Sequence, residues 1–196
     1  MKKTSDTCFK NFSANRRKKK REKMVELLEQ RGRFAEEKEA IQHGTTTVHE
    51  HSIRVADMSQ WLAEKLKLKV HQESLLRGAL LHDYFLYDWH HQEECTEGLH
   101  GFSHPKTAEK NASKDFNLTD VERDIIRHHM FPLTLSPPKT KEGWVVCAAD
   151  KICAVQETAG PMAKKAVDTG AQVSSSVLRR LRKGKGKEKQ RKGFDK

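Results

Sequence analysis

Histidine is concentrated in one part of this 196-residue sequence. All eleven histidines lie between residues 43 and 129. Neutral imidazole is a good ligand for divalent transition metals, and carboxylates can complete a site for two such ions. The pattern therefore indicates a metal site built from histidine and aspartate. The alternative is a histidine-rich surface of no particular function.

Three placements of ionisable residues favour a buried site over a histidine-rich surface. The doublet His82-Asp83 follows the apolar segment LLRGALL, and Asp150 follows the apolar segment VVCAA. His51 lies on a segment whose apolar spacing predicts an amphipathic helix. Burying such groups is costly unless they are hydrogen-bonded or bind a metal. We therefore expect each of them to have a cation or a donor beside it.

Helices are expected to position these residues. Apolar spacing predicts a first helix over residues 24–40, with Gly32 as a weak point, and a second from an N-cap within 45–47 to about residue 68. A short apolar helix is expected over 73–82, followed by a long aromatic-rich loop over 83–103. Pro105 suits the first turn of the next helix.

The second half of the chain also has a helical pattern. Thr119 and Glu122 form a capping-box pair that opens a helix to about residue 130, and three prolines keep the next stretch non-helical. A buried helix carrying Asp150 is expected over 141–158, and one or two more over 162–181. The predicted fold class is therefore all-α, a bundle of about six to eight helices.

Positive charge is concentrated at both ends of the chain. Residues 1–23 and 179–196 each carry a net charge of +8. Because the whole chain carries +11, residues 24–178 carry −5. We expect a flexible basic arm over 1–23, a helical domain over 24–178 and a flexible basic tail over 179–196. Both ends are expected to make only weak contact with nucleic acid, since no aromatic residues are interleaved for base stacking.

The cysteines and the apolar segments indicate in which cellular compartment the protein is expected. The four cysteines form no C-x-x-C pair, which fits neither a disulfide framework nor a zinc ribbon. No apolar run is long enough for a signal peptide core or a membrane span. We expect a cytoplasmic protein that does not contact the membrane. The sequence leaves its oligomeric state open.

The residues singled out above match a known pattern. His51, the doublet His82-Asp83 and Asp150, in the local sequences HSIRVA, ALLHD and VVCAADK, resemble the H…HD…D signature of the HD-domain superfamily of metal-dependent phosphohydrolases. The resemblance covers residues 44–158. It implies an α-helical bundle in which these four residues hold one metal ion and His82, Asp83 and Asp150 are catalytic.

Some members of this superfamily bind a second ion through additional histidines. His104 and His129 occupy suitable positions, His104 just before the helix expected to start at Pro105 and His129 near the end of the following helix. The resemblance thus implies a binuclear site bridged by Asp83. One or two divalent ions are expected, and Mn, Fe, Ni, Co or Zn is favoured over Mg alone because imidazole suits Mg poorly.

Four residues are candidates for binding the substrate. Lys151 and Arg54 are cations that could bind phosphate oxygens, or could simply face solvent. Trp89 could stack on a base or sugar, the alternative being a lid over the core. His128 is next to His129, but neighbours on a helix point about 100° apart. We therefore assign His128 to the substrate rather than to the metal.

The expected activity is hydrolysis of a phosphomonoester or phosphodiester, of a nucleotide in particular, by a metal-activated water. The substrate would be a small phosphorylated molecule. The alternative is a non-enzymatic helical module that binds RNA or another polyanion through its basic ends. A third reading is a partner-binding helical protein with a degenerate site.

Overall fold

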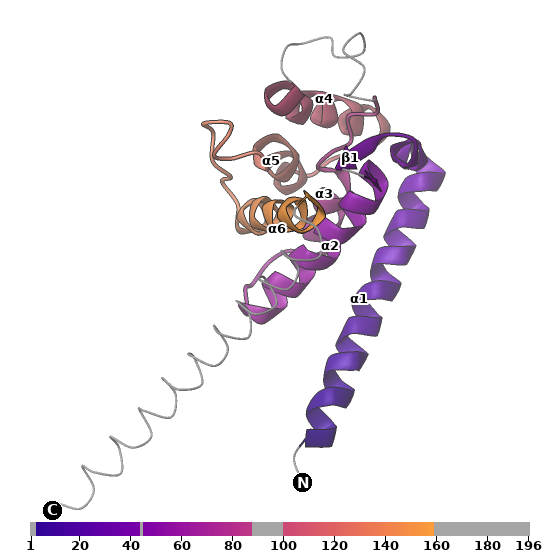
Figure 1. Ribbon diagram of the computed structural model, residues 1–196, viewed down its shortest axis with the longest axis vertical. Helices are drawn as coiled ribbons and strands as arrows, with labels where there is room; N and C mark the ends of the chain where they lie inside the picture. The colour runs from indigo at the N-terminus through magenta and orange to yellow at the C-terminus, as the bar shows by residue number, and fades with distance from the viewer. Residues whose placement is uncertain (1–2, 44, 88–99, 159–196) are drawn as a thin grey trace, which may run out of the picture. The chain divides into compact units, whose positions relative to one another are not determined.

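The computed structural model describes residues 3–43, 45–87 and 100–158 (Figure 1). The helices in these ranges are α1 (Lys3–Arg31), α2 (Val48–Lys65), α3 (Gln72–Leu81), α4 (His100–Asp115), α5 (Asp120–His128) and α6 (Lys141–Thr158). A 3-10 helix, η1 (Phe34–Lys38), and a small antiparallel hairpin of β1 (Ile41–His43) and β2 (Thr46–Thr47) connect α1 with α2. The predicted all-α fold is confirmed, with this hairpin as an addition.

Local capping explains where several helices begin. The Thr47 hydroxyl accepts from the Glu50 amide while the Glu50 carboxylate accepts from the Thr47 amide, and Thr119 and Glu122 repeat this capping box at the start of α5. Each box satisfies two amides that a helix start would otherwise leave unpaired. The helix starts predicted at these threonines are therefore confirmed.

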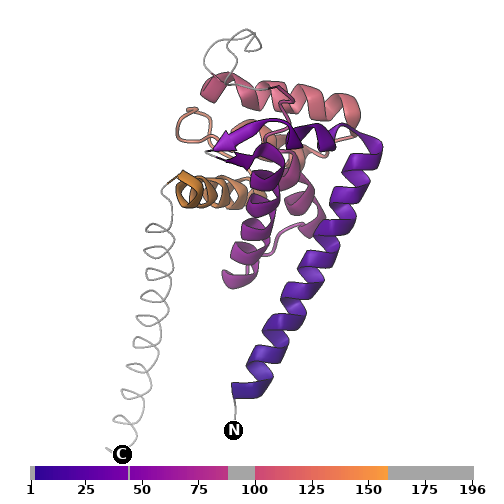
Figure 2. The ribbon, with the colours of Figure 1, turned by 45° about the vertical axis from the view of Figure 1, so that its right-hand side comes forward.

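The N-terminal helix differs from the expectation. Residues 3–23 are not a flexible arm but part of the continuous helix α1, which ends at Arg31 rather than near residue 40. Lys and Arg are good helix formers, and ion pairs from Arg17 to Glu64 and from Arg21 to Asp57 hold α1 beside α2 (Figure 2). The helix stops before Gly32, where a Cβ atom would lie 2.3 Å from the Phe116 ring.

The fourth helix also begins earlier than expected. Because α4 starts at His100, Pro105 lies inside it rather than in its first turn, and His104 lies on the helix rather than before it. A proline this close to a helix start gives up only the hydrogen bond to the carbonyl of residue 101. The helices expected over 162–181, the tail over 179–196 and Trp89 lie outside the described residues.

The core forms around α3, which packs against α2 and α5. Leu75, Ala79 and Leu80 on α3 are fully buried. A Cβ atom at Gly78 would lie 2.5 Å from the Ile125 side chain, so α3 and α5 approach closely only because residue 78 is glycine. None of the helices in the described ranges has the length and apolar character that crossing a membrane requires.

Candidate metal centre

Five helices contribute side chains to one buried cluster. The two halves of the doublet, His82 and Asp83, lie at the end of α3, where the helix gives way to a turn. The six predicted metal ligands are all buried and are brought together here: His51 on α2, His82 and Asp83 after α3, His104 on α4, His129 at the end of α5 and Asp150 on α6.

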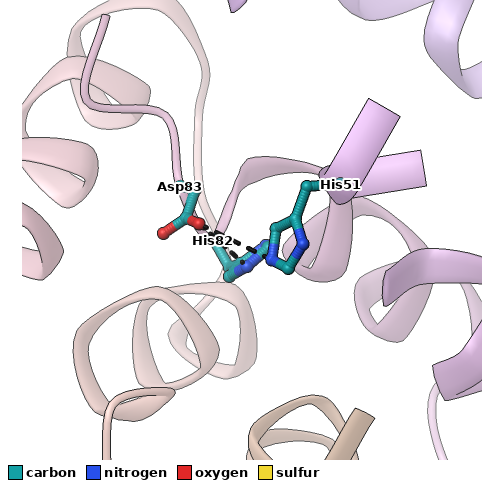
Figure 3. Close-up of side chains that lie close together, drawn as sticks. All are labelled: His51, His82 and Asp83. Carbon is teal, nitrogen blue, oxygen red and sulfur yellow. Dashed lines mark ion pairs between the residues drawn. The ribbon is translucent and has the colours of Figure 1, made fainter. Parts of the chain in front are cut away.

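One side of the cluster consists of His51, His82, Asp83 and Asp150 (Figure 3 shows the first three). Asp83 Oδ2 lies 3.3 Å from His82 Nε2 and 3.9 Å from His51 Nε2. Asp150 Oδ1 lies 3.1 Å from His51 Nε2 and 3.8 Å from His82 Nε2. His51, His82 and Asp83 offer ligand atoms within 4.8 Å of one another, a spacing that could hold a metal ion.

The other side of the cluster uses the second oxygen of Asp83. Asp83 Oδ1 lies 3.3 Å from His104 Nε2 and 3.3 Å from His129 Nε2, and the two imidazole nitrogens are 2.9 Å apart. These three residues form a second group with metal-ligand spacing. Asp83 therefore belongs to both groups and presents a different oxygen to each.

Hydrogen bonds from the far sides of the rings fix their orientation. His82 Nδ1 donates to the Ala79 carbonyl and His129 Nδ1 to the Ile126 carbonyl, both at 2.8 Å. His51 Nδ1 donates to Glu157 Oε2 at 2.9 Å. Because Nδ1 of each ring donates to these acceptors, Nε2 is the ring atom that faces the cluster and that would bind a cation in place of a proton.

Two properties of the cluster suit a divalent cation: some of its buried polar atoms lack a hydrogen-bond partner, and its donor atoms are of the types that bind such cations. Asp83 Oδ2 accepts a hydrogen bond from Gln42 Nε2 at 2.7 Å, but Asp83 Oδ1 and His82 Nε2 are buried without a hydrogen-bond partner among the described residues. Leaving such atoms unsatisfied costs about 1–3 kcal/mol each. Imidazole nitrogens and carboxylate oxygens suit divalent transition metals, so this donor set is that of a cation site.

The electrostatics of the cluster also call for positive charge. Burial disfavours the charged form of His51, but hydrogen bonds to Asp150 and Glu157 outweigh burial and raise its pKa to about 9. Burial likewise opposes ionisation of His82 and Asp83, yet their mutual attraction raises the pKa of His82 and lowers that of Asp83. The carboxylates thus need positive charge at this point, which a histidine proton or a divalent cation supplies.

The candidate substrate residues lie in different places. Lys151 is part-exposed, and its Nζ donates to the His129 carbonyl at 2.8 Å and lies 3.9 Å from Asp150 Oδ2. Arg54 pairs with Glu157 at 3.1 Å. His128 is not brought into the cluster, since its Nδ1 is bonded to Asp124 Oδ1 at 2.8 Å. The role predicted for Trp89 lies outside the described residues.

Sequence reasoning missed two residues that support the ligands. Glu157 bonds His51, and its position two turns after Asp150 on α6 places both carboxylates on one helix face, which was a readable signal. Gln42 bonds Asp83 from the short strand β1. No spacing in the sequence indicated that strand, so Gln42 could not have been found.

Comparisons with known proteins agree with this geometry. The family model described as HD domain matches residues 48–155, which is more than half of the chain and contains all six clustered ligands. The same comparisons gave no match to a curated protein or to a solved structure. Because a single family model spans the helices that carry the cluster, the chain belongs to the HD domain family, within the superfamily of metal-dependent phosphohydrolases.

Proposed function

We propose that this protein is an active metal-dependent phosphohydrolase that hydrolyses a phosphomonoester or phosphodiester, of a nucleotide in particular. The observation that carries the proposal is the position of Asp83, whose two oxygens face two separate groups of ligand atoms. Two-metal sites that share a carboxylate are suited to hydrolysing phosphate esters.

The candidate ligands would divide between two ions. His51, His82 and Asp150 would hold one ion with Asp83 Oδ2, while His104 and His129 would hold the other with Asp83 Oδ1. When bound, such ions supply Lewis acidity, which lowers the pKa of water and neutralises charge on a phosphoryl group. Mn, Fe, Ni, Co or Zn is expected rather than Mg alone, because four imidazoles contribute.

The chain's own residues orient this site and receive the substrate. The Ala79 and Ile126 carbonyls and the Glu157 carboxylate hold three imidazoles in place. The Lys151 side chain is 41% exposed and its ammonium group lies 3.9 Å from Asp150, which supports a role for Lys151 in binding a phosphoryl oxygen. Arg54 is engaged by Glu157 and supports His51 indirectly.

An aromatic surface near Lys151 supports a nucleotide as the substrate. Phe131, two residues after His129, stacks edge-on against Trp144 with ring centroids 5.4 Å apart. Trp144 is half-exposed and precedes Lys151 by seven residues on α6, which places both on the same helix face. A base could contact this exposed ring while its phosphate lies at the ligand cluster.

The experiment compares Asp83→Asn with Asp120→Asn, a control at an exposed position of α5. Hydrolysis of generic phosphomonoesters, phosphodiesters and nucleotides is assayed with Mn²⁺. We expect Asp83→Asn to lose at least about 100-fold in activity, because a shared ligand is altered, and Asp120→Asn to retain it. A chelator should abolish the wild-type activity and Mn²⁺ should restore it. Undiminished activity of Asp83→Asn would refute the proposal.

A second candidate function is binding of a polyanion through basic residues. The exposed side chains of Arg16, Lys18, Lys19, Lys20 and Lys23 lie along α1. Phosphate contacts of this kind give binding that weakens steeply with salt. RNA binding by these residues would be salt-sensitive and independent of the ligand cluster.

A further inference from the structure

The turn that follows Asp83 has a strained backbone. The Phe85 amide donates to the Asp83 carbonyl at 2.8 Å, so the chain turns tightly directly after the end of α3. Leu86 then has a φ of 59°, in the left-handed region that leucine rarely adopts. A backbone of this kind persists only where surrounding contacts hold it, and such positions are frequent at functional sites.

A side chain of α4 holds this turn. Asn111 Nδ2 donates to the Phe85 carbonyl at 2.9 Å and to the Tyr84 carbonyl at 3.3 Å, the two carbonyl groups that follow that of Asp83. Buried carbonyl groups just past a helix end need such a donor, because the helix offers them none. Tyr84 is anchored to the same helix, since its hydroxyl donates to Asp115 Oδ2 at 2.8 Å.

The helix α4 also carries one of the candidate ligands. His104 lies seven residues before Asn111, which is two turns, so both side chains project from one face of the helix. His104 Nε2 lies 3.3 Å from Asp83 Oδ1. The same helix face therefore supplies a candidate ligand and the donor that holds the backbone beside Asp83. The distance between His104 and Asp83 depends on how firmly Asn111 holds the turn.

The two oxygens of Asp83 are held unequally. Oδ2, which faces His82, accepts a hydrogen bond from Gln42 Nε2 at 2.7 Å. Oδ1 is buried and has no hydrogen-bond partner within the part of the chain that the structure describes. The backbone of the turn thus sets the position of Oδ1 relative to His104. Loss of the bonds from Asn111 would disturb the Oδ1 side more than the Oδ2 side.

We propose that Asn111 is a positioning residue for the ion on the side of His104 and His129. By holding the turn after Asp83 against α4, it fixes the spacing between Asp83 Oδ1 and these two imidazoles. Outer partners of metal ligands commonly set metal affinity in this way. This inference rests on the proposed binuclear centre, and it concerns the affinity for one ion rather than the hydrolytic step.

The experiment measures Mn²⁺ affinity of the full chain in two backgrounds that each keep one side of the cluster. Asn111→Leu has a similar size but no donor. In His51→Ala, which keeps the side of His104 and His129, we expect Asn111→Leu to lower the affinity by about 10–100-fold. In His104→Ala it should have little effect, whereas general damage to the fold would lower both affinities equally. Asn111→Gln retains an amide donor and should recover part of the loss.

Ala112→Gly is the matched control for stability. It weakens α4 at a fully buried position next to Asn111 without removing a bond to the turn. We expect a lower melting temperature with both Mn²⁺ affinities kept. A wild-type chain that binds no Mn²⁺ would overturn the proposed function together with this inference. Two bound ions with affinities that Asn111→Leu leaves unchanged, or lowers equally, would overturn this inference alone.

A second measurement uses only the wild-type protein, so it does not depend on how the variants fold. On titration with diamagnetic Zn²⁺, the side-chain amide resonance of Asn111 should shift as the ions bind, because the turn that it holds carries Asp83. The amide resonance of Asn117, which is exposed between α4 and α5, should stay in place. An Asn111 resonance that does not move after two ions have bound would also overturn the inference.

Discussion

The two carboxylate oxygens of Asp83 face different sets of imidazoles, so this residue belongs to both groups of candidate ligands. Oδ2 faces His82 and His51, and Oδ1 faces His104 and His129. His82, Asp83 and Asp150 could be singled out as candidate ligands because they follow apolar segments, and His51 because it lies on an amphipathic helix. His104 and His129 could be named only through the resemblance to a known family. Gln42 could not be named, since its contact with Asp83 depends on a hairpin that the sequence did not reveal.

Glu157 is expected to act through His51. Glu157→Gln weakens the acceptor that holds His51 Nδ1, so we expect metal affinity to fall about 10–100-fold while the fold is kept. Affinity is measured by competition with a chelator, and circular dichroism checks the fold. Glu36→Gln, at an exposed position, is the control. An unchanged metal affinity of Glu157→Gln would show that Glu157 does not position the ligand.

The positions of the clustered side chains depend on where the helices begin and end and on how closely the helices pack. The helix starts at Thr47 and Thr119 were predictable because a capping box is local. The length of α1 was not predictable from local sequence. The ion pairs that hold α1 against α2 join residues that are far apart in the chain, with separations of 36 and 47 positions. The close contact at Gly78 brings the end of α3 to the end of α5, and so His82 to His129, whose ring centroids are 4.9 Å apart.

The connection between α5 and α6 depends on Asp124. Its carboxylate accepts from the Thr140 hydroxyl at 2.6 Å, the Thr140 amide at 2.8 Å and the Lys139 amide at 3.1 Å. Burial raises the pKa of Asp124, but these bonds outweigh burial and lower it. Because the folded-state pKa lies below the unfolded one, the stabilisation is complete above the unfolded pKa and is lost as pH falls through the folded pKa.

We expect Asp124→Asn to lower the free energy of unfolding at pH 7 by about 1–3 kcal/mol. The difference from wild type should shrink as pH falls below about 4, because the Asp124 carboxylate of the unfolded chain then begins to take up a proton while that of the folded chain stays charged. Urea unfolding at several pH values measures both effects. A difference that stays constant down to pH 3 would contradict this account, and Asp120→Asn should show neither effect.

At the scale of the whole molecule, charge divides the chain into a body of net −5 and two ends of net +8. The expected boundary at residue 23 does not coincide with a structural one, because α1 is continuous to Arg31 and places Leu28 in the core. A count of charges detects only a change in composition, whereas the end of the N-terminal element depends on how α1 packs against the core. The basic N-terminal stretch is thus partly structural, held by Arg17 and Arg21.

Removal of residues 179–196 should leave chelator-sensitive turnover within about twofold of the full chain, because every clustered ligand lies before them. Removal of residues 1–23 should instead lower the melting temperature, since it deletes the ion pairs of α1. Turnover assays and thermal unfolding measure the two effects. Absence of turnover in the full chain, together with salt-sensitive RNA binding that is lost on removing residues 1–23, would favour the polyanion-binding function.

The metal content of the protein tests the bridged cluster most directly. Native mass spectrometry of chains loaded with Mn²⁺ should show two ions on the wild-type chain. His104→Ala should keep one ion, on the side formed by His51, His82 and Asp150. His51→Ala should keep the other ion, and Asp83→Asn should bind both weakly. A wild-type chain that takes up no ion, or whose metal content does not change in Asp83→Asn, would contradict the account.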